Sequence, residues 1–164
     1  VISENTNDYD QYELMIGKIE WNDQNISKIP KTIGLLDSLV WLELENNKID
    51  TIPGQIGTLK KLEYLQIYDN DLKYIHAGLG SLSHLKKLYL QNNKLDSLSF
   101  NFEQLTSLEV LWIDNNNISF LPQSLCTLIS EESLPTSEFY YYGNKICNQE
   151  HACSLEINEQ DCGN

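Results

Sequence analysis

A period of 23 residues runs through most of this chain and restricts its fold more than any other feature. The segment LKKLYLQNNKL, residues 85–95, has leucines at its first, fourth, sixth and last positions and an asparagine pair between them. Corresponding segments begin at Leu39, Leu62 and Leu108, so neighbouring copies are 23 residues apart. A fixed period of roughly 20 to 50 residues is typical of solenoids, in which similar coils stack on one another.

Two weaker copies flank these four. The earlier copy has Ile16, Ile19 and Trp21 in the apolar frame but Gln24 where the others have asparagine. The later copy, FYYYGNKI, returns to the frame after an insertion of five residues. The second halves of the units also align, as in IDTIPGQIGTL and ISFLPQSLCTL. We therefore expect about six coils.

Each unit begins with two apolar residues that alternate with polar ones, which predicts a short strand with one buried face. The chain must then turn back, and such a turn points backbone N–H and C=O groups inward without strand partners. An asparagine carboxamide carries both donors and an acceptor on a short stem, so it can satisfy them. We expect a structural ladder of buried asparagines formed by Asn47, Asn70, Asn93, Asn116 and Asn144.

These residues resemble the leucine-rich repeat family, specifically its 23-residue type with the pattern LxxLxLxxNxLxxIPxxIGxLxx. The resemblance covers about residues 16–149. It implies an α/β solenoid, a curved right-handed superhelix with a concave parallel β-sheet and short helical or irregular segments on the convex face. Departures from the pattern at Gln24, Glu103 and Cys126 predict degenerate ends and a locally altered convex side.

We interpret residues 1–164 as a single domain. Its predicted parts are an N-terminal cap at 1–15, the repeats at 16–146 and a cysteine-containing C-terminal cap at 147–164. An open solenoid needs such caps because each end exposes apolar surface.

All four cysteines lie in the last quarter of the chain, which predicts two disulfides that staple the C-terminal cap. We favour the pairs Cys147–Cys153 and Cys126–Cys162, because Cys126 and Cys147 should lie too far apart to bond. Four cysteines allow three connectivities, so the other pairings stay open. A zinc site built from Cys147, His151, Cys153 and Cys162 is an alternative, although the spacing CNQEHAC is unusual for one.

Disulfides form in oxidising compartments, so we expect an extracellular or cell-surface protein. The sequons at Asn25 and Asn117 are compatible with that location. The opening VISENTNDYD has neither the basic region nor the apolar stretch of a signal peptide, and a leader removed by processing stays open. The net charge of −13 disfavours nucleic acid, and no apolar run is long enough for membrane insertion.

No motif in the sequence predicts catalysis, a cofactor or a bound metal. His76, His84 and His151 fall in different segments, and no Gly-rich phosphate loop is present. Polar turn residues form an oxygen-rich row that could hold Ca²⁺, although Asp and Asn are also ordinary turn residues. This row is Asp23, Asn46, Asp69, Asn92 and Asn115.

The residues between the strand leucines should point outward and form continuous rows on the concave face. An aromatic diagonal is expected from Trp41, Tyr64, Tyr68, Tyr89, Trp112, Tyr140 and Tyr142. An acidic patch is expected from Glu20, Glu43 and Glu45, and Asp114 adds a further carboxylate to the binding surface. Trp21 falls in an inward frame, so we expect it to fill the core of the first coil.

Exposed tryptophan and tyrosine are typical of binding hot spots, although they could instead support the sheet by cross-strand stacking. The family resemblance implies protein–protein interaction. We therefore predict a non-catalytic recognition module that binds a protein or peptide, of basic character, on the concave face. Carbohydrate recognition and a structural ectodomain fragment of a larger surface receptor are the alternatives, and the oligomeric state stays open.

Overall fold

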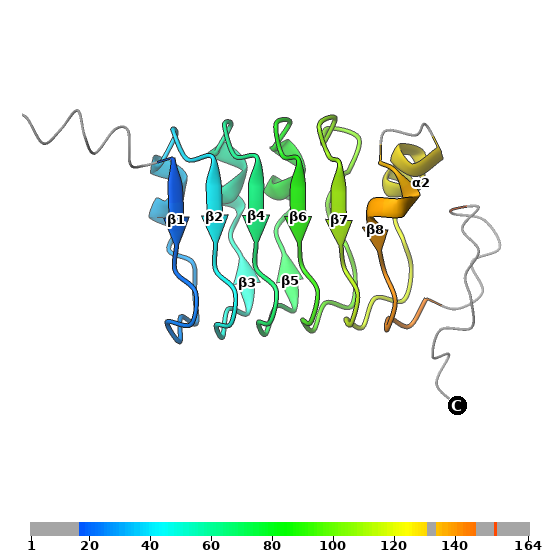
Figure 1. The fold of residues 1–164 in the computed structure, drawn as a ribbon, viewed down its shortest axis with the longest axis horizontal. Helices are drawn as coiled ribbons and strands as arrows, with labels where there is room; N and C mark the ends of the chain where they lie inside the picture. Colours follow the sequence, from blue (N-terminus) through cyan, green and yellow to red (C-terminus); the bar gives the residue numbers. More distant parts are fainter. Residues whose placement is uncertain (1–16, 131–133, 147–152, 154–164) are drawn as a thin grey trace, which may run out of the picture.

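The computed structural model describes residues 17–130, 134–146 and 153, and six short strands in them form one parallel sheet (Figure 1). The strands follow one another across the sheet in the order β1-β2-β4-β6-β7-β8. They are β1 (Lys18–Glu20), β2 (Trp41–Glu43), β4 (Tyr64–Gln66), β6 (Lys87–Tyr89), β7 (Val110–Trp112) and β8 (Phe139–Tyr140). Neighbours are 23 residues apart up to β7, as in the pair Leu42 and Leu65, whereas β8 pairs Phe139 with Leu111 after the insertion.

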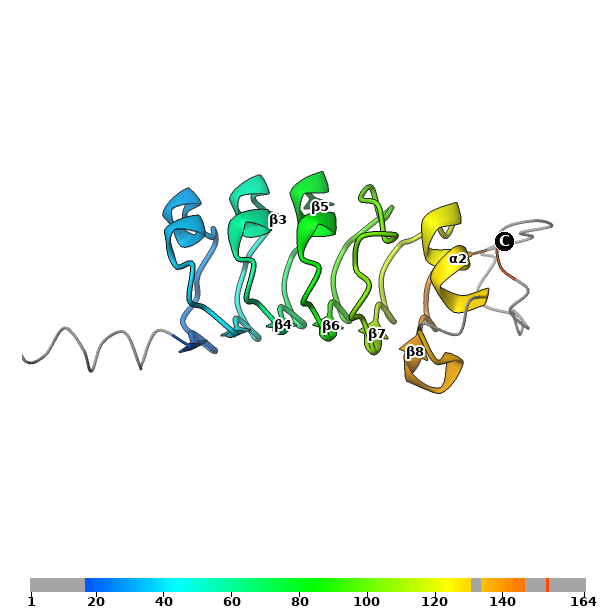
Figure 2. The same cartoon turned by 90° about the horizontal axis from the view of Figure 1, so that it is seen from above.

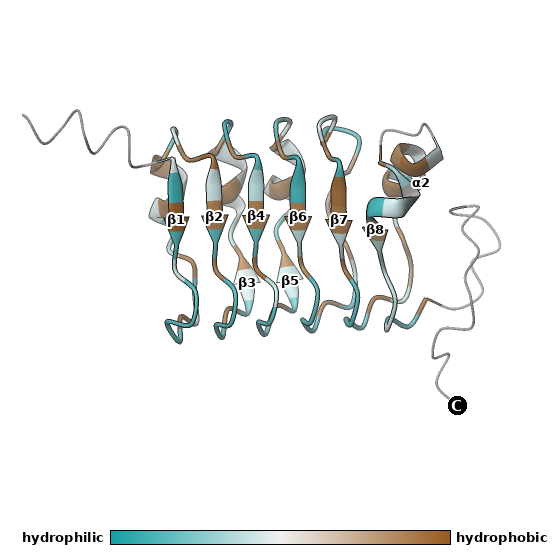
Figure 3. Ribbon diagram, viewed as in Figure 1, coloured by the Kyte–Doolittle hydropathy of each residue, from teal (hydrophilic) through white to brown (hydrophobic). Residues whose placement is uncertain are grey.

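Each strand is held by the burial of its central side chain. Leu42, Leu65 and Leu88 are completely buried, while the residues on either side of each are half-buried. Strands of three residues are too short to be stable alone, so the stacked neighbours supply most of the apolar contact. Figure 3 shows the result as an apolar band that crosses the strands, with mostly hydrophilic turns below them.

The opposite side of the solenoid carries short helices, which Figure 2 shows as a layer facing away from the sheet. The 3₁₀ helices are η1 (Lys31–Leu35), η2 (Gly54–Thr58) and η3 (Ala77–Ser81), and the α-helix is α2 (Gln123–Ser130). A two-stranded parallel sheet made of β3 (Thr51–Ile52) and β5 (Tyr74–Ile75) lies between the main sheet and the helices along the chain. A last 3₁₀ helix, η4 (Thr136–Glu138), leads directly into β8.

Glycines allow neighbouring 3₁₀ helices to approach closely. A Cβ atom added at Gly57 would lie 2.3 Å from the carbonyl oxygen of Gly78, and one at Gly80 would lie 2.5 Å from that of Asn101. At the corresponding positions of the next two coils, the chain has Glu103 and Cys126 in place of glycine. The coil that contains Glu103 has no helix on this side, and the coil that contains Cys126 has the longer helix α2.

The asparagine ladder runs along the turns that follow the strands. In the case of Asn93, the carboxamide oxygen accepts a bond from the N–H of Leu72 (2.9 Å). Its nitrogen donates to the carbonyls of Ile67 (2.9 Å) and Leu90 (3.0 Å). These bonds join one coil to the coil before it. All five ladder residues are buried, at 9% exposure or less: Asn47, Asn70, Asn93, Asn116 and Asn144.

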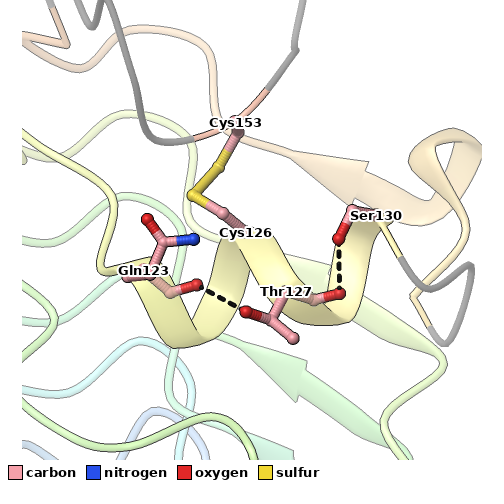
Figure 4. Close-up of a disulfide and its surroundings, with 5 residues drawn as sticks. All are labelled: Gln123, Cys126, Thr127, Ser130 and Cys153. Atoms are coloured by element: carbon pink, nitrogen blue, oxygen red, sulfur yellow. Dashed lines mark hydrogen bonds between the residues drawn. A yellow bond between two sulfur atoms is a disulfide. The ribbon is translucent and has the colours of Figure 1, made fainter.

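One disulfide lies at the C-terminal end and joins Cys126 of α2 to Cys153, with 4.9 Å between the two Cα atoms (Figure 4). Both predicted pairs, Cys147–Cys153 and Cys126–Cys162, are therefore wrong, since each uses one of these two cysteines. The buried Cys126 belongs to the core, and Cys153 packs against that core from the tail. No periodic rule relates the tail to α2, so spacing alone could not select this pair.

Several predicted features lie outside the described residues. They include the N-terminal cap at 1–15, most of the C-terminal cap at 147–164, and Cys147, His151 and Cys162 of the alternative zinc site. In the ranges that the structure does describe, no helix has the length and apolar character needed to cross a bilayer.

Candidate functional site

The outer face of the six-stranded sheet, which we call the strand face, displays the side chains that alternate with the buried leucines. Strand register brings these residues into columns, with neighbours opposite one another on adjacent strands. The first column is Lys18, Trp41, Tyr64, Lys87 and Val110, and the second is Glu20, Glu43, Gln66, Tyr89, Trp112 and Tyr140. The third follows the strands and is Asn22, Glu45, Tyr68, Gln91, Asp114 and Tyr142.

Two aromatic rings lie between two lysines at the N-terminal half of this face. Trp41 and Tyr64 stack, with 4.0 Å between ring centroids and 21° between the planes. The ammonium of Lys18 lies 4.8 Å from the Trp41 ring centroid, and that of Lys87 lies 5.6 Å from the Tyr64 centroid. Both distances are within the range of cation–π attraction. We call Lys18, Trp41, Glu43 and Tyr64 the N-terminal cluster.

The carboxylates of this half already have partners. Glu43 accepts hydrogen bonds from the Trp41 indole (2.5 Å) and the Asn22 amide (3.3 Å), and it lies 3.5 Å from the Lys18 ammonium. Lys18 also pairs with Glu20 at 2.5 Å. Their hydrogen bond raises the pKa of the Lys18 ammonium and lowers the pKa of the Glu20 carboxyl. Both carboxylates therefore have partners within the protein, although they share the single positive charge of Lys18.

Glu45 also has a hydrogen-bond donor on the strand face, the hydroxyl of Tyr68. Burial, together with a hydrogen bond to Glu45, raises the pKa of the Tyr68 hydroxyl, which stays protonated at neutral pH. The structure thus brings the members of the predicted acidic patch together, but it gives each of them a donor from the strand face itself.

A second aromatic group lies on the last three strands. Trp112 contacts Tyr89 edge-on, with 5.0 Å between centroids, and Tyr140 at a tilt, with 4.9 Å between centroids. Among the described residues no ring contact joins Tyr64 to Tyr89, so five of the seven residues of the predicted diagonal form two separate groups, and Tyr68 and Tyr142 belong to neither. Tyr140 and Tyr142 are the most exposed of the predicted aromatic residues, at 41% and 53%.

Polar atoms of this second group lack the partners found in the first. The indole nitrogen of Trp112 and the amide oxygen of Gln91 reach no solvent and have no hydrogen-bond partner. Burial raises the pKa of the Asp114 carboxyl, which accepts hydrogen bonds from its own backbone N–H and, at 3.4 Å, from the Asn115 amide. We call Tyr89, Gln91, Trp112, Asp114 and Tyr140 the C-terminal cluster.

The choice of site residues from the sequence missed Lys18, Lys87 and Gln91. Sequence reasoning favours aromatic side chains, which are typical of binding hot spots, and carboxylates, which steer a basic partner. The three missed residues stand in the same columns, so their place in the repeat was the available clue. Their contacts with Trp41 and Tyr64, and the unpaired Gln91 oxygen, depend on side-chain geometry that the period does not determine.

Trp21 is 39% exposed, and the expectation that it fills the core of the first coil is wrong. It lines an open pocket of about 320 Å³ together with Ile26, Ile29 and Leu44. The residue belongs to the first described coil, so within residues 17–130 no earlier coil covers its outer side. A larger hollow of about 470 Å³, lined by Tyr74 and His76 among others, lies away from the strand face.

The oxygen-rich turn row has a backbone explanation. Its five members have φ between +52° and +58°, in the left-handed region that asparagine and aspartate tolerate better than other side chains. These residues are Asp23, Asn46, Asp69, Asn92 and Asn115. In the described part of the chain, no three His, Cys, Asp or Glu side chains are grouped so that they could hold a metal ion.

Coils of 23 residues from β1 to β7, six parallel strands in succession, and a buried asparagine at five of the turns define a leucine-rich repeat solenoid that displays the strand face. A family model described as "Leucine Rich repeats (2 copies)" matches residues 83–125, while no curated protein gives a significant match. The chain belongs to the leucine-rich repeat family, as the sequence predicted.

Solved structures agree with this assignment. The LRR ectodomain of the receptor kinase SOBIR1 from Arabidopsis thaliana is 30% identical with a TM-score of 0.64, and the match covers 77% of this chain and 68% of that one. A chain of the BIR3–SERK2 complex from the same plant is 26% identical with a TM-score of 0.62, over 82% and 71%. A chain of the PEPR1–AtPEP1 structure is 34% identical with a TM-score of 0.60, over 71% and 16%.

Proposed function

We propose that this protein is a non-catalytic recognition module that binds a protein or peptide on its strand face. The observation that carries the proposal is the pair of aromatic clusters on an uncovered sheet surface, including two half-buried tryptophans, Trp41 and Trp112. Large rigid aromatic side chains provide contact area at little entropic cost, and they are enriched in binding hot spots.

The similar structures support the same class of ligand. One is part of the BIR3–SERK2 complex, and another is part of PEPR1–AtPEP1. The SOBIR1 match is to the ectodomain of a receptor kinase. Together with the disulfide at Cys126, this supports an extracellular or cell-surface location, where such bridges persist.

The proposal includes one domain over residues 1–164, with caps at 1–15 and 147–164 that protect the ends of the stack. The partner on the strand face is a protein or peptide with basic groups, because the chain has a net charge of −13. Complementary charge raises the rate of encounter and excludes acidic competitors.

A double substitution tests the strand face as the binding site. Peptides would be selected with the wild-type protein from a phage-displayed library of random peptides. Their affinity would then be measured for the wild type and for Trp41→Ala/Trp112→Ala. We expect the variant to bind the selected peptides at least about thirtyfold more weakly, because the loss of hot-spot aromatics typically costs about 2 kcal/mol or more, while the protein still unfolds cooperatively.

Tyr74→Ala/Phe120→Ala is the matched control, since these two aromatic residues are about half exposed but do not belong to the columns of the strand face. Equal loss of binding in this control, or unaltered binding in the tryptophan variant, would refute the assignment. A glycan array probed with both proteins covers the carbohydrate alternative: glycan binding lost only in the tryptophan variant would replace the peptide with a sugar as ligand.

A further inference from the structure

The two clusters of the strand face differ in how far their polar groups are satisfied. In the N-terminal cluster, Glu43 has the Trp41 indole, the Asn22 amide and the Lys18 ammonium around it. In the C-terminal cluster, the indole nitrogen of Trp112 and the amide oxygen of Gln91 have no partner. A buried polar group without a hydrogen-bond partner is unfavourable, so the second cluster stands to gain more from a ligand.

Asp114 is the charged member of the C-terminal cluster. It stands between Gln91 and Tyr142 in the third column, and backbone bonds from Asn92 to Asp114 (3.0 Å) and from Asn115 to Tyr142 (2.7 Å) keep the three in register. The ion pairs found in the described residues are Lys18–Glu20, Lys18–Glu43, Lys86–Glu63 and Lys94–Asp71, so none of them neutralises Asp114.

The carboxylate of Asp114 and the unpaired amide oxygen of Gln91 therefore lie in neighbouring positions of the third column, just after β7 and β6. The rings of Tyr89, Trp112 and Tyr140 occupy the adjacent column. A carboxylate beside aromatic faces is the chemistry that attracts an ammonium or guanidinium, through charge-assisted hydrogen bonds and cation–π contact. The first cluster already contains its own cation in Lys18, whereas the second does not.

We propose that the C-terminal cluster receives a lysine or arginine side chain of the protein partner, which pairs with Asp114 and lies against the Trp112 and Tyr140 rings. This inference rests on the proposed function and assigns the cation to a single carboxylate. The same segment can offer a main-chain carbonyl to the Trp112 indole. The amide oxygen of Gln91 and the indole nitrogen of Trp112 reach no solvent, so the amide or the indole must rotate for either atom to meet the ligand.

The three tryptophans provide a local readout, because Trp21, Trp41 and Trp112 each give one indole N–H resonance in a ¹H–¹⁵N NMR spectrum. The probes are N-acetyl-arginine methylamide and N-acetyl-lysine methylamide, with N-acetyl-glutamine methylamide as the neutral control. We expect one of the cationic probes to shift the Trp112 resonance saturably while Trp41 and Trp21 stay in place. The glutamine compound should produce no saturable shift.

Asp114→Asn should weaken this binding about tenfold, the effect of losing one charge-assisted contact. Asp96→Asn, a matched change at an exposed carboxylate off the strand face, should leave it unaltered. The folding control is thermal unfolding, in which Asp114→Asn should be at least as stable as the wild type. The reason is that burial disfavours the charged carboxylate, as its raised pKa indicates.

Failure of this inference can be told apart from failure of the proposed function. A Trp112 resonance that neither cationic probe moves, or binding that Glu43→Gln abolishes and Asp114→Asn does not, overturns the assignment to Asp114. Library peptides that require the two strand-face tryptophans but bind Asp114→Asn normally would keep the proposed function and overturn only the cation site. Absence of any tryptophan-dependent peptide would overturn the proposed function.

Discussion

At the scale of the residue, the asparagine ladder and the strand face use similar polar groups in opposite ways. The carboxamide of Asn93 is buried and bonded at both of its polar atoms, and it contacts backbone groups of two coils. The carboxamide oxygen of Gln91, two residues earlier, is buried and has no partner. The first arrangement stabilises the fold. The second leaves a hydrogen-bond acceptor without a partner on the surface that we propose binds the ligand.

Asn93→Ala tests the ladder. The substitution leaves the N–H of Leu72 and the carbonyls of Ile67 and Leu90 without their side-chain partner inside the stack. We expect the free energy of unfolding to fall by about 3 kcal/mol, measured by urea denaturation. Asn46→Gly is the control, since Asn46 is exposed and its φ of +52° suits glycine, and it should change stability by less than about 0.5 kcal/mol. Equal effects of the two changes would argue against the ladder.

At the scale of the element, the 3₁₀ helices set how closely the coils can approach on the side away from the sheet. η2 and η3 contact each other through glycine backbone, because a Cβ at Gly57 or Gly78 would collide with a carbonyl oxygen of the facing helix. The coil with Glu103 and the coil with Cys126 depart from this arrangement. The sequence could predict that the pattern changes there, but not that one coil would lose its helix while the next gained α2.

Gly57→Ala tests this contact. The added methyl group would lie 2.3 Å from the Gly78 oxygen, so the two helices must separate, and overpacking of this kind costs about 1 to 3 kcal/mol. Thermal or urea unfolding would measure the loss. Gly17→Ala has no atom within 4 Å of the new methyl and should be close to neutral. A Gly57 variant as stable as the Gly17 variant would mean that the coils are not in close contact.

At the scale of the whole molecule, stability depends on the stacking of neighbouring coils. The pocket beside Trp21 lies at the first described coil, whereas the disulfide joins Cys153 to Cys126 in α2, the helix that follows β7. The bridge closes a loop of 27 residues, for which chain-entropy arguments give a stabilisation of about 3 kcal/mol.

Cys153→Ser should therefore lower the free energy of unfolding by about 3 kcal/mol. Proteolysis of the unreduced wild type, followed by mass spectrometry, should yield a peptide pair that contains Cys126 and Cys153. Cys162→Ser is the control and should retain that pair. A linkage of Cys126 to Cys147 or Cys162 in the wild type would contradict the pairing.

The sequence by itself determined the family and the alternation of buried and displayed residues. Equal coils give residue i the same surroundings as residue i+23, so one copy predicts the next, including the inward asparagines and the column order of the strand face. Only the tertiary structure decided the Cys126–Cys153 bridge, the exposure of Trp21, the split of the aromatic row and the partners of each carboxylate. These features depend on the non-repeating ends and on side-chain geometry across strands, and no period encodes either of them.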